Sequence, residues 1–211
     1  MDRTDLLLQD EIPVIILDNF YDDSELTLIW EELEFLTYSH KLLPPDQTGS
    51  ALNQEDHETP LKSNSGIFLD TVWANQRQMS NILNVNRKIF NDDMKVFKDS
   101  PSWFFREFRC LLDHTLISYY EQGDYYKPHK DNSYVTALSW FCREPKRFSG
   151  GDLRLHSEHD MGEVEYANNR TVIFPSCISH EVTPVVMDKK YYNKRLGRYC
   201  MTQFLDLPIN G

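Results

Sequence analysis

Short segments rich in β-branched and aromatic residues follow one another through the second half of the chain, and they constrain its fold most. Turn-forming Gly, Pro, Asn and Asp separate these segments. They are HTLISYY (114–120), SYVTALSWF (133–141), GDLRLH (151–156), RTVIFP (170–175), HEVTPVV (180–186) and RYCMTQFLDL (198–207). Several short strands at this spacing favour a sandwich or barrel over βαβ units.

The first half of the chain has a different pattern. Residues 12–17 form an apolar run that predicts a short strand. Asp22 followed by Glu25 matches a capping box and predicts the start of a helix. The apolar positions of this helix recur at helical spacing and are Leu26, Ile29, Trp30, Leu33 and Leu36. A second helix is expected from about 74 to 91, where apolar residues again share one side.

Residues 40–66 are rich in Pro, Asp, Asn, Ser, Gly and His and show no hydrophobic periodicity, which predicts a long surface loop. Such loops often cover a binding site, and a plain excursion elsewhere on the surface is the alternative. The predicted organisation is one α+β domain over 1–211. Its helical flank spans 1–112 and includes the loop, and its β core spans 113–207.

Composition excludes several classes of partner. The formal charge of −11 repels phosphates, and no Lys- or Arg-rich stripe offsets it, so a nucleic acid partner is disfavoured. No apolar run has the length of a transmembrane helix, and the first residues lack a signal-peptide apolar region. The cysteines form no CxxC pair, which disfavours a disulfide framework or zinc knuckle. We therefore expect a cytoplasmic protein without a membrane partner; its oligomeric state stays open.

Two histidines and one aspartate form the candidate metal site. His129 and Asp131 are two residues apart, so in an extended segment both point to the same side. His180 opens a later strand, after the apolar segment that ends in FPSCIS (174–179). Two imidazoles and one carboxylate leave three positions open on a metal, which suits non-haem Fe(II). A closed zinc site needs a fourth ligand, often Cys, and none is suitably placed.

Arg198 is the candidate for binding an anion. On a strand, Arg198, Cys200, Thr202 and Phe204 share one face, so the guanidinium points into the interior. A buried guanidinium needs an anion, and the distal carboxylate of 2-oxoglutarate is a suitable bidentate partner. The alternatives are a surface ion pair for Arg198 and the use of Arg195 instead.

These motifs, in this order, resemble the 2-oxoglutarate/Fe(II)-dependent oxygenase superfamily, and specifically its prolyl 4-hydroxylase-like branch. The resemblance rests on YxxGxxYxxHxD (120–131), SGGDL (149–153), FPSxxxHEVTPV (174–185) and GRYxxT (197–202). Residues 12–33 also resemble the opening strand and helix of that branch. The resemblance implies a double-stranded β-helix, or jelly-roll, that holds Fe(II) through His129, Asp131 and His180. It also implies that Arg198 binds 2-oxoglutarate.

Further pocket residues are implied by the same resemblance. Tyr120 stands where relatives have a pocket tyrosine, Thr202 shares the strand face of Arg198, and the apolar positions of the co-substrate channel are Leu138, Leu153 and Val182. Trp140 replaces a common tyrosine, and its indole N–H is an alternative carboxylate donor. Arg198 follows His180 at a longer distance than is usual, which we attribute to a longer hairpin at 187–197.

The implied function is a dioxygenase that uses O₂, Fe(II) and 2-oxoglutarate, with ascorbate as a candidate reductant. It would hydroxylate a prolyl or other amino-acid side chain, in a peptide, an amino acid or a small metabolite, and release succinate and CO₂. Demethylation or desaturation at the same iron is one alternative. A non-catalytic jelly-roll module that binds a metal or small ligand is another. The residues 40–66 are expected to close over the site when substrate binds.

Overall fold

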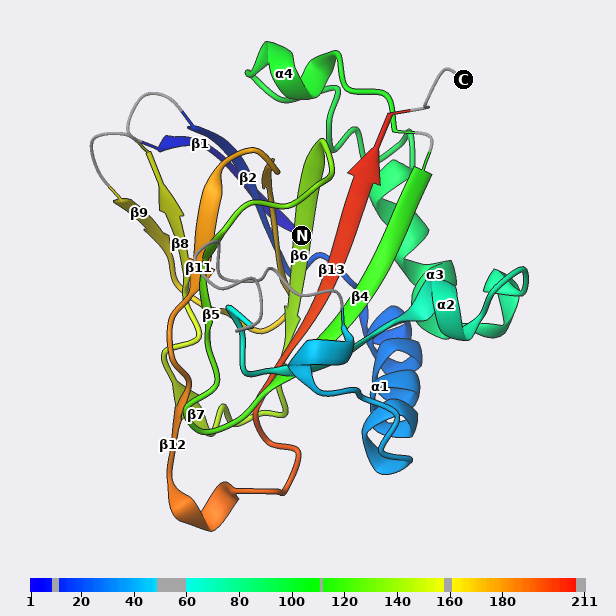
Figure 1. The fold of residues 1–211 in the computed structure, drawn as a ribbon. Helices are drawn as coiled ribbons and strands as arrows, with labels where there is room; N and C mark the ends of the chain where they lie inside the picture. The colour runs from blue at the N-terminus through cyan, green and yellow to red at the C-terminus, as the bar shows by residue number, and fades with distance from the viewer. Residues whose placement is uncertain (9–11, 49–59, 111, 158–160, 208–211) are drawn as a thin grey trace.

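Two antiparallel sheets face each other in the computed structural model, which describes residues 1–8, 12–48, 60–110, 112–157 and 161–207 (Figure 1). The large seven-stranded sheet has the order β1 (Asp2–Leu8), β2 (Ile12–Asp18), β10 (Arg170–Pro175), β6 (Val135–Phe141), β13 (Arg198–Asp206), β4 (Leu112–Tyr120), β3 (Ser65–Phe68). The small four-stranded sheet has the order β5 (Tyr126–His129), β11 (Ser179–Val182), β8 (Leu153–His156), β9 (Met161–Val164). A separate pair is formed by β7 (Phe148–Ser149) and β12 (Val186–Met187).

The strands after residue 112 alternate between the two main sheets. Along the chain, β4, β6, β10 and β13 join the large sheet, whereas β5, β8 and β11 join the small sheet between them. This alternation is the winding of a double-stranded β-helix, so the expected jelly-roll is confirmed. The strand predictions for 114–120, 133–141, 151–156, 170–175 and 198–207 are confirmed within one or two residues at most ends.

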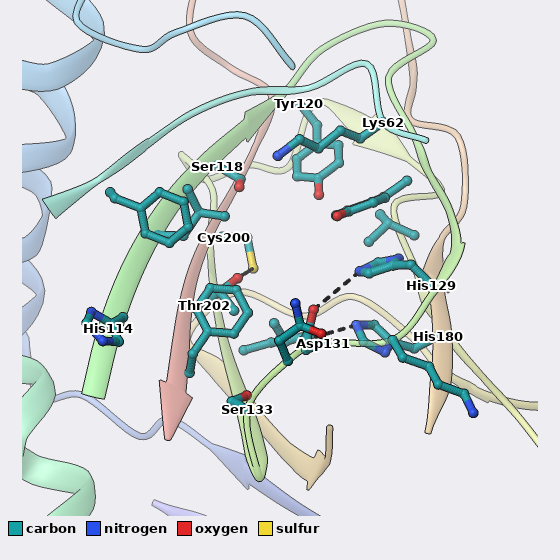
Figure 2. A pocket seen from close by; sticks show the side chains of 18 of the residues that line it. Lys62, His114, Ser118, Tyr120, His129, Asp131, Ser133, His180, Cys200 and Thr202 are labelled. Atoms are coloured by element: carbon teal, nitrogen blue, oxygen red, sulfur yellow. Dashed lines mark hydrogen bonds and ion pairs between the residues drawn. The ribbon is translucent and has the colours of Figure 1, made fainter. Parts of the chain in front are cut away.

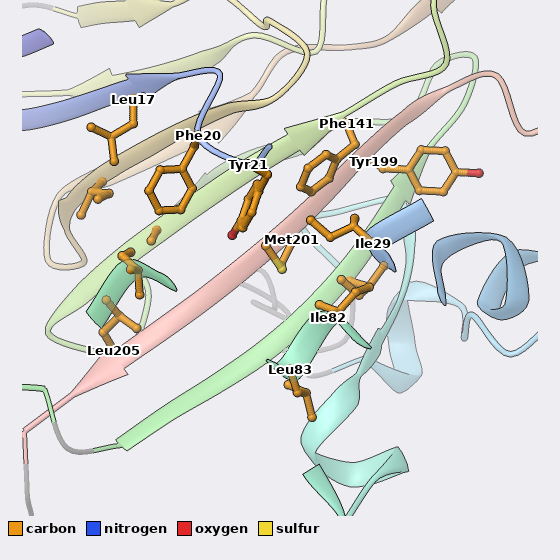
Figure 3. Packing of buried hydrophobic residues seen from close by; sticks show 14 of the residues in the cluster. Leu17, Phe20, Tyr21, Ile29, Ile82, Leu83, Phe141, Tyr199, Met201 and Leu205 are labelled. Carbon is orange, nitrogen blue, oxygen red and sulfur yellow. The ribbon is translucent and has the colours of Figure 1, made fainter. Parts of the chain in front are cut away.

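The first helix, α1 (Asp23–Tyr38), has the predicted capping box. The Asp22 side chain accepts hydrogen bonds from the backbone N–H groups of Ser24 and Glu25, and the Glu25 side chain accepts one from the Asp22 N–H. The buried face of α1 carries Ile29, Leu33 and Leu36 and belongs to the cluster that covers the outer face of the large sheet (Figure 3). No helix among the described residues is long and apolar enough to cross a membrane.

The predicted second helix at 74–91 is wrong as a continuous element. The structure has the 3₁₀ turn η2 (Arg77–Met79), the short helix α3 (Asn81–Val85) and the 3₁₀ turn η3 (Asn86–Phe90). The interruption falls at Ser80, whose side-chain oxygen accepts the Leu83 N–H and caps α3. Ile82, Leu83 and Ile89 are still buried. The apolar pattern therefore predicted correctly that this segment faces the core, and it was wrong in predicting one continuous helix. Two single-turn helices, α2 (Leu69–Val72) and α4 (Trp103–Arg106), complete the flank.

The flank also supplies strands that were not predicted. β1 and β3 form the two edges of the large sheet, although both belong to 1–112. β1 leaves most of its side chains exposed or half-buried, so it lacks the apolar pattern by which a buried strand is recognised. The short strands β5, β7 and β9 in the core were missed for lack of length.

The described ends of the expected 40–66 loop are fixed to both sheets. Residues 61–63 pair with β5, through hydrogen bonds from Lys127 N to Leu61 O (2.8 Å) and from Ser63 N to Tyr125 O (3.2 Å). β3 begins at Ser65 and pairs with β4, and Leu43 pairs with Gly66. The prediction of an irregular loop is therefore corrected at its C-terminal end. Residues 49–59, and with them the expected cover over the site, lie outside the described part of the chain.

Glu32 connects α1 to the broken helical segment. It is 5% exposed, and its carboxylate accepts hydrogen bonds from Trp73 Nε1 (2.9 Å), Ser80 Oγ (2.8 and 2.9 Å) and Ile82 N (2.7 Å). A buried carboxylate with this many donors is satisfied, whereas its removal would leave the donors without partners.

Glu32→Ala is expected to lower the free energy of unfolding by about 2–4 kcal/mol, because three donors lose their acceptor in a buried setting. Denaturant unfolding followed by circular dichroism measures the change. The neighbouring Glu31→Ala, on the exposed side of the same helix, is the control and should change stability by less than about 0.5 kcal/mol. Equal effects of the two substitutions would contradict the structural role of Glu32.

Candidate active site

A cavity of about 440 Å³ lies between the two sheets. The large sheet lines it with alternate residues of β4 and β13, and the small sheet with residues of β5 and β11 (Figure 2). At one end the lining residues Tyr120 and Arg198 are almost completely buried. At the other end His114 is exposed and Phe204 half-buried, so this end is the mouth.

His129, Asp131 and His180 meet on the small-sheet side of the cavity, as predicted (Figure 2). His129 ends β5 and lies directly opposite His180 of β11 in the sheet register. The Asp131 carboxylate lies between them, with Oδ1 3.6 Å from His129 Nε2 and Oδ2 3.4 Å from His180 Nε2. The three ligand atoms all lie within 4.8 Å of one another.

Backbone carbonyls orient both imidazoles. His129 Nδ1 is 2.8 Å from Lys127 O, and His180 Nδ1 is 2.9 Å from Ile178 O. Since a carbonyl only accepts, each Nδ1 carries the proton and donates it, which leaves the Nε2 lone pair facing Asp131. The Tyr126 ring stacks on His129 with the centroids 3.5 Å apart and thereby fixes the plane of that imidazole.

The electrostatics keep these groups in the form that binds a metal. Burial lowers the pKa of His129 to about 4, and the neighbouring His180 adds to the effect, so the imidazole is neutral at pH 7. Burial alone would raise the pKa of Asp131, but hydrogen bonding and the electrostatic interaction with the two neighbouring histidines outweigh it and lower that pKa. A neutral His129 imidazole beside an ionised Asp131 carboxylate is the state that a divalent cation requires.

The donor set fits Fe(II). Among the residues that the structure describes, this group of three offers two imidazole nitrogens and one carboxylate oxygen. Such a set leaves positions free for a co-substrate and O₂, whereas a structural zinc site would be closed by a fourth protein ligand.

Arg198 begins β13 and is 0% exposed. Its Nε donates to Gly151 O at 2.8 Å, and its Cζ lies 4.8 Å from the Tyr120 ring centroid, 5.3 Å from that of Tyr166 and 5.4 Å from that of Trp140. Its Nη1 and Nη2 are buried and have no hydrogen-bond partner among the described residues. A buried guanidinium without acceptors is stabilised by an anion. The two parallel N–H groups of the guanidinium match the two oxygens of a carboxylate. The residue therefore fits the distal carboxylate of 2-oxoglutarate.

Arg195 does not share this cavity. Its guanidinium packs over the Tyr38 ring at 3.5 Å from the centroid, and it is not among the lining residues. Between His180 and Arg198 the chain forms β12 and the 3₁₀ turn η4 (Lys189–Tyr191). Because β12 pairs with β7 and not with β13, the extra residues do not form the hairpin expected at 187–197.

The two glycines of the SGGDL segment stand where a side chain would not fit. Gly151 has φ +74°, and a Cβ there would lie 2.7 Å from Arg198 Cδ. Gly150 has φ +67°, and a Cβ there would lie 2.2 Å from Pro184 O. Both glycines have positive φ, which few other residues adopt, and the segment brings the Gly151 carbonyl against the guanidinium.

Four of the other predicted pocket residues line the cavity, namely Tyr120, Leu138, Val182 and Thr202. Trp140 and Leu153 are completely buried and do not line it. Trp140 stacks on Tyr166 with centroids 5.4 Å apart, and its Nε1 has no hydrogen-bond partner among the described residues. Trp140 therefore lies beside Arg198 without lining the cavity, and neither its proposed role as a carboxylate donor nor the channel role of Leu153 is tested by the structure.

Sequence reasoning missed several lining residues. Phe204 lies opposite His114 in the β13–β4 register, and both stand at the mouth together with Phe68. The period-2 pattern already placed Phe204 on the strand face of Arg198, and the same pattern could have identified Phe204 and His114 as lining residues. Lys62 also lines the cavity, donating to Thr48 O at 3.0 Å with its Nζ 5.6 Å from the Tyr126 ring centroid. No local pattern indicates its position.

This chain is similar to a known protein family and to solved structures. Residues 115–206 match the model of the 2OG-Fe(II) oxygenase superfamily. No curated protein sequence matches the chain. In structure the chain is similar to a prolyl-4-hydroxylase from Pseudomonas putida, with a TM-score of 0.56 and 15% identity over 92% of each chain.

Two further solved structures show the same fold. One is a prolyl hydroxylase from Trichoplax adhaerens in complex with a peptide fragment of the hypoxia inducible factor oxygen degradation domain (TM-score 0.64, 15% identity, 92% of this chain and 83% of that one). The other is the viral collagen prolyl hydroxylase of Paramecium Bursaria Chlorella virus-1 with 2OG (TM-score 0.51, 11% identity, 91% and 94%). Residues 115–206 are therefore similar to the 2OG-Fe(II) oxygenase superfamily, which supports an oxygenase, and the chain has the fold of the prolyl 4-hydroxylases.

Proposed function

We propose that this oxygenase hydroxylates a prolyl or other amino-acid side chain, with a peptide as the preferred form of the substrate. The observation that carries the proposal is one cavity that contains both the His129, Asp131 and His180 group and the buried N–H groups of Arg198, which have no hydrogen-bond partner among the described residues. A metal site alone would suit many proteins. A metal site beside a guanidinium prepared for a carboxylate suits a 2-oxoglutarate-dependent reaction.

Each residue has a distinct role in this proposal. His129, Asp131 and His180 hold Fe(II), and Arg198 holds the distal carboxylate of 2-oxoglutarate. Bound Fe(II) supplies the oxidative chemistry in which O₂ and 2-oxoglutarate yield succinate and CO₂ while a substrate C–H becomes C–OH. The protein contributes orientation and a dry cavity, whose walls include the apolar Leu138 and Val182.

The size of the cavity favours the entry of one substrate side chain rather than of a whole peptide. A volume of about 440 Å³ holds 2-oxoglutarate and one side chain, so the remainder of a peptide would lie across the mouth. Phe68 and Phe204 border this mouth with ring centroids 6.2 Å apart. Such an aromatic border favours an apolar side chain. Two of the similar structures carry names that refer to peptide or collagen substrates, which agrees with this choice.

The competing proposal is a module that binds a metal or small ligand without catalysis. The two are separated by adding Fe(II) and 2-oxoglutarate without O₂. An oxygenase forms the weak visible charge-transfer band of chelated 2-oxoglutarate, and absence of this band would reject the proposed function. Demethylation and desaturation use the same site, and the mass of the product distinguishes them, because only hydroxylation leaves one added oxygen.

His129→Ala and Asp131→Ala are each expected to abolish retention of Fe(II) while the protein remains folded, because these side chains contribute ligand atoms more than core burial. Metal analysis after anaerobic loading and desalting, together with thermal melts, measures both quantities. His114→Ala, a histidine at the mouth of the same cavity, is the control and should retain iron. Full iron occupancy in the first two variants would reject the assigned ligands.

Arg198→Ala is expected to raise the KM for 2-oxoglutarate on the order of a hundredfold while sparing Fe(II) binding, since a bidentate charge pair in a desolvated pocket is lost. Arg195→Ala should have little effect, because its guanidinium packs on Tyr38 outside the cavity. Steady-state kinetics with varied 2-oxoglutarate measures both. A larger effect of Arg195→Ala would show that the wrong arginine has been assigned.

Peptides that contain proline are expected to stimulate succinate release above the level without substrate, and to gain one oxygen atom. The assay contains Fe(II), 2-oxoglutarate and ascorbate, and compares matched peptides with Pro replaced by Ala, other residue types, and free amino acids. The His129→Ala variant is the negative control. Stimulation by free amino acids alone would keep the hydroxylase and reject the peptide.

A further inference from the structure

Thr136 contacts the carboxylate of the candidate metal ligand. It is the second residue of β6, is 0% exposed, and its Oγ1 lies 2.6 Å from Asp131 Oδ2. An ionised carboxylate can only accept, so the Thr136 hydroxyl donates its single proton to Asp131. Such charge-assisted hydrogen bonds are short and stronger than neutral ones.

Two serines continue this contact into a chain of hydroxyls. Ser176, directly after β10 and also 0% exposed, has its Oγ 2.8 Å from Thr136 Oγ1. Because the Thr136 proton is already used on Asp131, Ser176 is the donor in this pair. Ser133 Oγ lies 2.7 Å from Ser176 Oγ, and Asp131 N donates to Ser176 O at 3.2 Å. Ser176 therefore supports the backbone of Asp131 directly and its side chain through Thr136.

The position of Thr136 makes this support rigid. Thr136 pairs with Phe174 in the β6–β10 register, within the interior of the large sheet, whereas Asp131 follows the short β5 of the small sheet. The hydroxyl chain is thus a connection from the well-anchored sheet to a carboxylate on a loop. Among the described residues, the other side chains within 4.0 Å of the Asp131 carboxylate oxygens that could orient it are the two histidines.

We propose that Thr136 is a positioning residue for Asp131: by holding Oδ2 it presents Oδ1, the oxygen that faces His129 Nε2, to the metal as a single ligand atom. This inference rests on the proposed function. One-oxygen ligation matters because a carboxylate that used both oxygens would occupy a position that the co-substrate or O₂ requires. Hydrogen-bond partners of ligating residues commonly tune metal affinity in this manner.

A purely structural role for the hydroxyl is the alternative, and the protein contains a matched control for it. Ser139 Oγ and Thr171 Oγ1 lie 2.7 Å apart on β6 and β10, both are buried, and neither lines the cavity. Thr171→Val and Thr136→Val each remove a buried threonine hydroxyl from the same sheet. They differ in whether that hydroxyl reaches a metal ligand.

The experiment is an anaerobic titration of the full-length variants with Co(II), whose visible absorption reports both affinity and coordination, repeated with Fe(II) plus 2-oxoglutarate. Thr136→Val is expected to bind Co(II) about 10- to 100-fold more weakly and with an altered spectrum. Thr136→Ser, which restores the hydroxyl, should recover most of the affinity. Thr171→Val should bind Co(II) as the unsubstituted protein does, although its thermal stability should fall as that of Thr136→Val does.

Unchanged Co(II) affinity in Thr136→Val, or an equal loss in Thr171→Val, would overturn the inference. Should Thr136→Val fail to fold, Ser176→Ala replaces it, because it leaves Thr136 in place but removes its donor. A smaller loss of affinity is expected there, and unchanged affinity overturns the inference. If the unsubstituted protein binds neither metal, the proposed function itself fails, and that result is distinct from a failure confined to Thr136.

Discussion

The guanidinium of Arg198 is the constraint on which the rest of the site depends. A positive charge at 0% exposure loses its hydration, and the chain compensates only in part, with the Gly151 carbonyl and the faces of three aromatic rings. None of the described residues accepts the remaining N–H groups, so a ligand that enters the cavity is a suitable partner for them. Folding therefore builds an anion site, and it uses a glycine at a position where a Cβ would collide with the arginine.

The two faces of the large sheet have different roles. The outer face contributes to stability, and the inner face carries residues of the site. The outer face of the large sheet packs against α1 and the broken helical segment in one hydrophobic cluster, and its inner face packs toward the small sheet in another. Since β4, β6 and β13 contribute residues to both clusters, the side chains that alternate along these strands point in turn to the outer core and to the space between the sheets. The helical flank thus fixes the strands on which the anion site stands.

The sequence predicted those parts of the site that follow from periodicity. His129 and Asp131, two residues apart, share a side of the chain, and Arg198 and Thr202 share a strand face, as alternation requires. The prediction was wrong where a long-range contact overrides a local pattern. Ser80 ends one turn and caps the next helix while bonding to Glu32, which is far away in the sequence. Lys62 could not be placed, because its position comes from pairing between residues 61–63 and β5.

The buried end of the cavity and its mouth also differ in how far the sequence predicts their residues. The buried end of the cavity is built from long strands with regular alternation, so its residues are fixed by the jelly-roll itself. The mouth combines the distal halves of β4 and β13 with β3 and Lys62, which come from outside the β core. Segments that join a sheet by edge pairing can change in sequence without disturbing the strands behind them. The mouth, where we propose that the substrate is selected, therefore lies in the part of the chain where alternation carries least information, whereas the anion site at Arg198 lies where it carries most.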